Sequence, residues 1–272
     1  MDRRQFSFAL AAGAVSLPSL TLPSLAFADP GPALAAAVAG PQRTAQNTVR
    51  DPWRKPLEAL SFWGISPGQM MIEISPGTGY WTEILAPYAK ATGGRYMATA
   101  GPGSSAFKAR FADEAVFGKV EYTSFSQTSG PLAPAGTADW LLTARNIHDW
   151  MWVAGYLDKA LKDFREVLKP GGILAIEDHR SDPRPMVPEA RDGYVSTEFM
   201  IRTVSAAGFR LHSQSELGAN PRDTKDHPFG VWTLPPTRRN MTADKPTPPG
   251  FDPAKYEAIG ESDRMTLRFV KV

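Results

Sequence analysis

Residues 70–81 read MMIEISPGTGYW, a short apolar run followed by a turn rich in glycine. A continuous apolar run of this length is typical of a buried strand in a parallel sheet. The next segment, TEILAPYA at residues 82–89, has apolar residues at helical spacing. Gly77 and Gly79 lack Cβ atoms, so a ligand can approach the backbone of the turn closely. The stretch therefore predicts a strand, a turn and a helix that together direct backbone N–H groups at a ligand.

The rest of the chain continues this alternation of strand-like and helix-like segments. Further strands are predicted at residues 94–100, 120–125, 138–144, 172–178, 209–217 and 265–272. Helices are predicted at residues 33–39, 51–62, 107–117, 152–168 and 196–207. The alternation requires crossover connections, and it indicates an α/β fold with a mostly parallel sheet and helices on both faces.

The composition fits one large globular domain. The chain has 272 residues, of which 42% are hydrophobic. We expect a single domain at residues 29–272. A polar stretch rich in proline at about residues 218–260 is too long for a plain loop, so we expect it to form a lid-like insertion.

Charge and cysteine content narrow the function classes. The formal net charge is +2, so no nucleic-acid partner is predicted. The chain has no cysteine, which excludes disulfides and thiolate metal ligands. The oligomeric state is left open by the sequence.

The first 28 residues have the pattern of a targeting segment. RRQF at residues 3–6 is a twin-arginine pattern, and an apolar stretch follows it. AFA at residues 26–28 presents small residues at the positions that a signal peptidase reads. Pro18 and Pro23 interrupt the apolar stretch, which argues against a stable spanning helix. We therefore expect a twin-arginine signal peptide at residues 1–28, a periplasmic or exported protein, and no stable membrane anchor after cleavage.

The spacing of the turn residues separates two classes of cofactor. The turn does not read G-x-G-x-x-G, so a dinucleotide site and an oxidoreductase are disfavoured. The acid Glu73 followed by Ser75, Gly77 and Gly79 resembles the motif acid-x-Gly-x-Gly-x-Gly of class I S-adenosylmethionine-dependent methyltransferases, with serine replacing the first glycine. LKPGGILAIED at residues 168–178 resembles the segment before the fifth strand of the same superfamily.

Several longer stretches narrow the resemblance to one family. Together they resemble a family of exported, predicted class I methyltransferases over nearly the whole chain after residue 33. The stretches are SPGTGYWTEILAPY (75–88), RNIHDWMW (145–152), KPGGILAIEDHR (169–180), NPRDTKDHPFGVWTLPPT (220–237) and IGESDRMTLRFVKV (259–272).

The resemblance implies a fold, a cofactor and a reaction. The fold is a Rossmann-like sheet of seven strands in the order 3-2-1-4-5-7-6, with strand seven antiparallel. The cofactor is S-adenosylmethionine, and the reaction is methyl transfer to a small-molecule acceptor. The cofactor-binding candidates are Glu73, Ser75, Gly77, Gly79, Tyr80, Trp81, Thr99 and Asn146.

An alternative function is a non-catalytic binding protein that keeps the fold and holds a nucleoside-like or other small ligand. In the superfamily the second strand usually ends in an acid that binds the ribose hydroxyls. Here the strand reads YMATAGPG, and Thr99 is the nearest polar group. The missing acid and Ser75 favour the binding protein, whereas a dense set of titratable groups favours the enzyme.

Three of the four histidines lie beside an aspartate on loops that we expect at the carboxyl edge of the sheet: His148-Asp149, Asp178-His179 and Asp226-His227. Such a pair can act as a general base, can bind a divalent metal, or can hydrogen-bond loop backbones and hold the insertion in place. The catalytic candidates are His148, Asp149, Asp178, His179 and His227, and no metal ligand is assigned.

Two arginines on the same loops are candidates for contact with a substrate. Arg145 and Arg180 can pair with a carboxylate or a phosphate, and ordinary ion pairs explain them equally well. The aromatic residues Tyr80, Trp81, Trp150 and Trp152 either stack on a ligand ring or lie in the core.

Overall fold

The computed structural model describes residues 31–101, 103–186 and 190–272, so the signal peptide predicted at residues 1–28 lies outside the described residues. One sheet of seven strands organises the chain, in the order β3-β2-β1-β4-β5-β8-β6. The strands are β1 (Met70–Ile74), β2 (Arg95–Thr99), β3 (Val120–Thr123), β4 (Ala138–Ala144), β5 (Leu168–His179), β6 (Phe209–Ser215) and β8 (Arg264–Lys271). Strand β8 is antiparallel to β5 and β6, whereas β1 to β5 pair in parallel. The predicted order is confirmed, because β8 is the seventh strand of this sheet.

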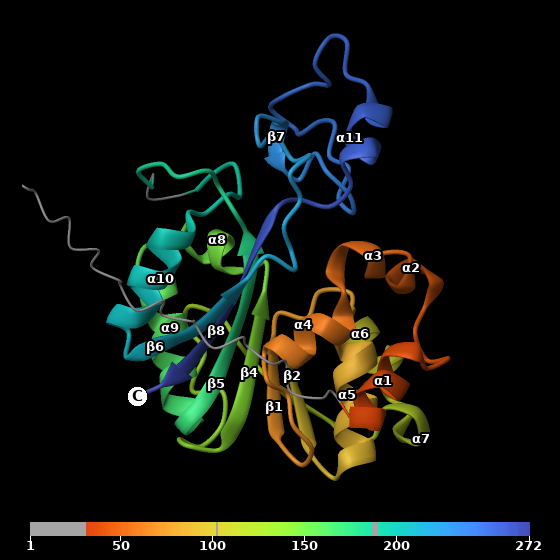
Figure 1. The fold of residues 1–272 in the computed structure, drawn as a ribbon, viewed down its shortest axis with the longest axis vertical. Helices are drawn as coiled ribbons and strands as arrows, with labels where there is room; N and C mark the ends of the chain where they lie inside the picture. Colours follow the sequence, from red (N-terminus) through yellow and green to blue (C-terminus); the bar gives the residue numbers. More distant parts are fainter. Residues whose placement is uncertain (1–30, 102, 187–189) are drawn as a thin grey trace, which may run out of the picture.

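Helices cover both faces of the sheet (Figure 1). One face carries α1 (Gly31–Ala39), α4 (Pro56–Phe62) and α5 (Thr82–Thr92), and the other carries α8 (Ile147–Trp150), α9 (Tyr156–Val167) and α10 (Thr197–Ala206). The remaining helices are short: α2 (Ala45–Thr48), α3 (Asp51–Arg54), α6 (Ser105–Arg110), α7 (Glu114–Phe117) and α11 (Pro253–Ile259).

Two predicted helices are each divided in two. The helix expected at residues 51–62 breaks at Lys55, whose φ is 42°, because Pro56 disfavours helical geometry in the residue before it. The helix expected at residues 107–117 becomes α6 and α7, whereas the one expected at 152–168 is the single helix α9, which begins at Tyr156. The sequence pattern therefore predicted the positions of these helical regions correctly, but it did not predict the breaks within them.

The alternation of side chains along the strands builds two cores. On β1, Met70, Ile72 and Ile74 pack with α9 and α10, whereas Met71 packs with α5. On β5, Ile173 and Ala175 belong to the α5 face, and Leu174 and Ile176 to the other. A period of two then places Glu177 and His179 on the α5 face and Asp178 on the α8 face. This separation governs which charged groups can meet at the end of β5.

The insertion, residues 218–260, holds β7 (Pro228–Val231) and α11, neither of which was predicted. It projects beyond the end of the sheet, at the top of Figure 1. A small cluster of buried residues forms its own core: Leu234, Tyr256 and Ile259. Among the described residues, no helix combines the length and the apolar character needed to cross a bilayer.

Candidate functional site

The turn after β1 is open to a ligand. Gly77 is exposed and has a φ of +58°, and a Cβ at this position would meet no atom within 4 Å. The backbone N–H of Ser75 donates to Thr99 Oγ1 at 2.7 Å, which ties the turn to the end of β2. Within the described residues, the N–H groups of Gly77 and Thr78 donate no hydrogen bond. These free donors at an exposed glycine form a surface that a polar ligand can use.

Gly79 differs from Gly77 because the position that a Cβ would take at Gly79 is occupied by other atoms of the protein. A Cβ at Gly79 would lie 2.4 Å from Phe111 Cζ, closer than packed atoms approach. Phe111 is buried and packs against Phe107 and Phe117. The missing Cβ of Gly79 therefore leaves room for the aromatic side chains that follow β2. Of the two glycines, Gly77 is the one that faces open space.

Glu73 lies beneath the turn rather than in it. The side chain is on the α5 face, and Glu73 Oε2 accepts hydrogen bonds from Thr82 Oγ1 at 2.9 Å and from the Tyr96 hydroxyl. Burial raises the pKa of Glu73 to about 7, although the hydrogen bonds from Tyr96 and Thr82 act in the opposite direction. These contacts give Glu73 the role of a brace between β1, β2 and α5.

Other cofactor-binding candidates also have partners within the protein. Tyr80 and Trp81 are buried, and their rings pack edge to face with centroids 4.9 Å apart. The Tyr80 hydroxyl donates to Asp51 Oδ1 at 2.6 Å. Asn146 Nδ2 donates to the Ile74 carbonyl oxygen at 3.1 Å, which joins the ends of β1 and β4. The aromatic pair thus supports the turn from the core, and Asn146 lies at its edge.

His148 forms a dyad with Asp178 across two neighbouring strand ends. His148 Nδ1 lies 2.7 Å from Asp178 Oδ1. Asp178 is fully buried, and its carboxylate accepts from the N–H groups of Ile147 (2.9 Å), His148 (3.3 Å) and His179 (2.8 Å). These amides hold the carboxylate in one position, so that His148 Nδ1–H donates to Asp178 and Nε2 is left to accept a proton.

The charges around His148 favour its protonated form. Burial disfavours the imidazolium, but the Asp178 carboxylate outweighs burial, and the pKa of His148 is raised. Asp149 Oδ1 lies 3.4 Å from His148 Nε2, on the opposite side of the ring from Asp178. Burial raises the pKa of Asp149, and the nearby His148 opposes this effect. The arrangement is that of a buried general base with a carboxylate behind it.

His179 has the opposite electrostatic environment. Its Nδ1 lies 2.5 Å from Ser262 Oγ, and its ring centroid lies 4.9 Å from that of His148. Burial lowers the pKa of His179 far below its usual value, and the positive charges of His148 and Arg145 add to the effect. His148, Asp178 and His179 present ligand atoms within 4.8 Å of one another, a spacing that suits a metal ion. The neighbouring arginines oppose a cation at this position.

His227 lies apart from the dyad, in the insertion. Its Nε2 lies 2.8 Å from Asp223 Oδ1, whereas its Nδ1 is 3.9 Å from Asp226 Oδ1. Asp223 also accepts from the Tyr194 hydroxyl at 3.0 Å. Asp223 is therefore the nearer carboxylate partner of His227, and the geometry favours the structural alternative for His227.

Asp178 and His179 are adjacent in sequence, but their side chains have different partners. Neighbouring residues on β5 point to opposite faces, and the hydrogen bond between these two joins the His179 backbone N–H to the Asp178 carboxylate. The Asp178 side chain also bonds to His148 on the next loop, and the His179 side chain bonds to Ser262. Ser262 lies in the segment IGESDR at residues 259–264, and no spacing in the sequence indicated a role for it.

His148 of the dyad lines a cavity of about 130 Å³ at the carboxyl edge of the sheet. Arg145, His148, Asp149 and His179 come from the ends of β4 and β5. The insertion and the segment before β8 supply the other lining residues: Val231, Trp232, Pro235, Pro236, Thr237, Glu261 and Ser262. The Trp232 ring lies 5.8 Å from that of His148. The insertion therefore covers the dyad.

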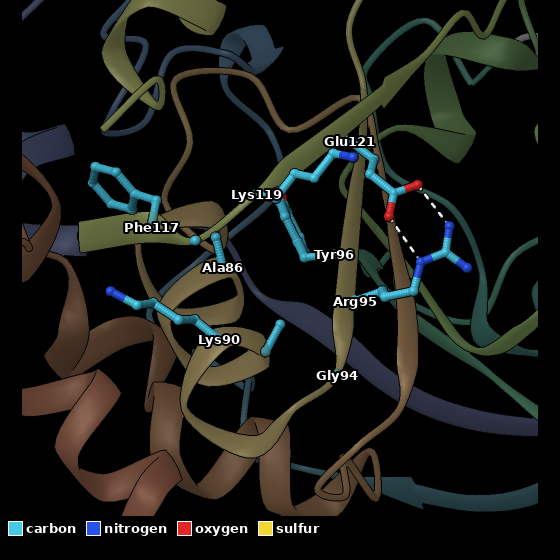
Figure 2. Close-up of a pocket in the computed structure, with 10 residues that line it drawn as sticks. Ala86, Lys90, Gly94, Arg95, Tyr96, Phe117, Lys119 and Glu121 are labelled. Atoms are coloured by element: carbon cyan, nitrogen blue, oxygen red, sulfur yellow. Dashed lines mark hydrogen bonds and ion pairs between the residues drawn. The ribbon is translucent and has the colours of Figure 1, made fainter. Parts of the chain in front are cut away.

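A larger cavity of about 420 Å³ lies at the other edge of the sheet (Figure 2). Its lining includes Lys90, Lys119, and the exposed Arg95 with its partner Glu121 (Nη2–Oε2 2.7 Å). Arg95 begins β2, so this cavity is at the amino end of the strands. Ligands of open α/β sheets bind at the carboxyl ends, and the smaller cavity therefore has the functional position.

Strand order and the antiparallel strand β8 define a Rossmann-like class I methyltransferase fold. A methyltransferase structure from Aquifex aeolicus, described as dependent on S-adenosylmethionine, matches 84% of the chain and 97% of its own, with a TM-score of 0.53 and 18% identity. The [4+2]-cyclase SpnF matches 83% of the chain and 80% of its own, with a TM-score of 0.53 and 16% identity. Since a cyclase shares the fold, the fold alone does not define the reaction.

One sequence relative has a named activity. The ubiquinone/menaquinone biosynthesis C-methyltransferase UbiE of Hydrogenovibrio crunogenus is 27% identical over 146 residues. The match spans 52% of the chain and 54% of that relative, so the chain spans about half the length of the curated protein it matches. No protein-family model matches the chain.

Proposed function

We propose that the protein is an S-adenosylmethionine-dependent methyltransferase with a small-molecule acceptor. The observation that carries the proposal is the His148–Asp178 dyad, which lies at the same edge of the sheet as the open turn at Gly77. The relative UbiE, which is a C-methyltransferase, supports the reaction class. The fold supports the placement of both elements at one edge.

The residues of the turn fit the proposed cofactor. Gly77 leaves room at the backbone, and the N–H groups of Gly77 and Thr78 are free to donate. Ser75 and Thr99, joined to each other, form the floor between β1 and β2. When bound, S-adenosylmethionine supplies an electrophilic methyl group on a sulfonium centre.

His148 is the proposed general base. Its Nε2 accepts a proton from the acceptor as the acceptor atom becomes nucleophilic, and Asp178 stabilises the imidazolium that results. Asp149, 3.4 Å from Nε2, adds to this stabilisation. Trp232 and the neighbouring residues of the insertion exclude water from the cavity.

A transfer assay with a labelled methyl group tests the proposal. The full protein is incubated with S-adenosylmethionine labelled in its methyl group and a small-molecule extract, and labelled products are separated from the cofactor. We expect a labelled product that His148→Gln reduces by about two to four orders of magnitude. His212→Gln is the matched control, because His212 is an exposed histidine on β6. Equal labelling by the His148→Gln variant would refute the assignment of the base.

We also propose that the protein is exported, on the pattern of residues 1–28 alone. Cell fractionation of the full chain and of an Arg3→Lys, Arg4→Lys variant tests this. Export predicts a periplasmic protein that the double variant retains in the cytoplasm. Equal distribution of the two proteins would refute the twin-arginine route.

A further inference from the structure

Four arginines gather beside the dyad, on the α5 face of the sheet. We call Arg50, Arg54, Arg145 and Arg264 the arginine cluster. Arg50 precedes α3 and Arg54 ends it, Arg145 follows β4, and Arg264 begins β8. Arg54 and Arg264 are only 4% and 2% exposed. Buried guanidinium groups require acceptors, because they cannot lose their charge at ordinary pH.

Two carboxylates, Glu177 and Glu261, compensate the cluster incompletely. Glu261 accepts from Arg50 Nε at 2.7 Å, from Arg54 Nε at 3.0 Å and from Arg264 Nη1 at 2.9 Å. Glu177 accepts from Arg264 Nη1 at 2.7 Å. Four positive groups against two negative groups leave an excess of two positive charges. Nearby Asp51 and Asp178 accept no hydrogen bond from the cluster, because their side-chain partners include Arg43 and His148 instead.

The arginine cluster also lacks hydrogen-bond acceptors. Arg50 Nη2, Arg54 Nη2, Arg145 Nε and Arg264 Nε are buried nitrogen atoms without a hydrogen-bond partner. Most buried polar groups in proteins have a partner, so four unpaired donors in one cluster indicate a missing acceptor. Arg145 makes no side-chain hydrogen bond or ion pair with any described residue. Arg180, by contrast, is paired with Glu216 and Asp263.

The cluster opens into the cavity of the dyad. Arg145 and Glu261 line that cavity together with His148 and His179. Glu261 binds the other three arginines, so it connects the cavity wall to the rest of the cluster. A volume of about 130 Å³ corresponds to roughly four water molecules, which suits a carboxylate or phosphate group.

We propose that the acceptor carries an anionic group, a carboxylate or a phosphate, which binds Arg145 and the arginine cluster and places the acceptor beside His148. The inference rests on the proposed methyltransferase function, and it names the acceptor class for the same site. An anion supplies the missing oxygen acceptors and offsets the excess positive charge. The anionic group of the acceptor would bind at the ends of β4, β5 and β8. It would therefore lie on the same side of the sheet centre as the dyad, away from β2 and β3.

The anionic group could also come from the cofactor, since S-adenosylmethionine has a carboxylate of its own. Two ligands separate the sources: S-adenosylhomocysteine has the carboxylate, and methylthioadenosine lacks it. Inorganic phosphate serves as the probe for the acceptor's anion. The variant is Arg145→Gln, and the matched control is Arg95→Gln, which removes the same charge at the opposite edge of the sheet.

Calorimetric titrations of the full protein test the proposal. We expect phosphate to bind in the presence of saturating S-adenosylhomocysteine, and Arg145→Gln to weaken that binding about 10- to 100-fold while Arg95→Gln leaves it unchanged. We also expect Arg145→Gln to leave the affinity for S-adenosylhomocysteine within about threefold of the unsubstituted protein's.

Three results would overturn an assignment, and they are distinguishable. If Arg145→Gln weakens S-adenosylhomocysteine tenfold or more but not methylthioadenosine, the cluster belongs to the cofactor's carboxylate. If phosphate binding is absent or insensitive to Arg145→Gln, the anion site is refuted and the methyltransferase proposal stands. If S-adenosylhomocysteine fails to bind the unsubstituted protein, the proposed function itself fails.

Discussion

Replacement of Glu73 by glutamine should change how the stability of the protein depends on pH. Glu73 is buried beneath the turn and has a pKa of about 7, raised by burial from 4.5. Because its pKa is higher in the folded state, the group favours folding in its protonated form. Its contribution is present below pH 4.5 and is lost as pH rises to about 7. The difference between the two pKa values, 4.5 and about 7, corresponds to about 3 kcal/mol in the free energy of unfolding.

Glu73→Gln removes this titration and keeps an oxygen that can accept from Thr82 and Tyr96. We expect the free energy of unfolding of the variant, relative to the unsubstituted protein, to increase by about 2 to 3 kcal/mol between pH 5 and pH 8. Urea denaturation at four pH values measures this difference, with Glu58→Gln on the exposed face of α4 as control. A pH dependence identical in the two proteins, or a variant that loses stability as pH rises, would refute the account of Glu73.

Further predictions concern the base and the two glycines. The ratio kcat/KM should fall as pH decreases through the raised pKa of His148, since the base must be neutral, and His148→Gln should abolish this acidic limb in a pH–rate profile. Gly77→Ala should weaken S-adenosylhomocysteine at least about tenfold, by calorimetry, while lowering stability by only about 1 kcal/mol. Gly79→Ala should lower the free energy of unfolding by about 2 to 4 kcal/mol, because its Cβ meets Phe111, and Phe111→Leu should recover part of this loss. Equal effects of the two glycine substitutions on ligand binding and stability would contradict their separate roles.

The fold was largely predictable because its signals are local and repeated. The apolar runs, the turn at Gly77 and the helical stripe of α9 each limit the local structure, and alternation then fixes a mostly parallel sheet. The resemblance supplied the strand order, which hydrophobic spacing alone does not give. The breaks within predicted helices, as at Lys55, depended on details of φ that apolar spacing does not encode.

The site was only partly predictable because its contacts join distant residues. Sequence proximity suggested that His148 pairs with Asp149, whereas its principal partner is Asp178, thirty residues away. The arginine cluster draws from α3, β4 and β8, and no spacing in the chain indicates that Arg54 and Arg264 meet at Glu261. Such pairings follow from strand order and from the alternation of faces, and they appear only once the sheet is assembled.

The most direct test of the account is a thermal-shift comparison of S-adenosylmethionine, S-adenosylhomocysteine and NAD with the same protein. Each ligand is added at increasing concentration, and the unfolding midpoint is followed. The account predicts stabilisation by the first two ligands, reaching about 2.7 kcal/mol at a hundredfold excess over the dissociation constant, and none by NAD. The absence of any shift with the first two ligands, or an equal shift with NAD, would contradict the claim that the turn at Gly77 holds an S-adenosyl cofactor.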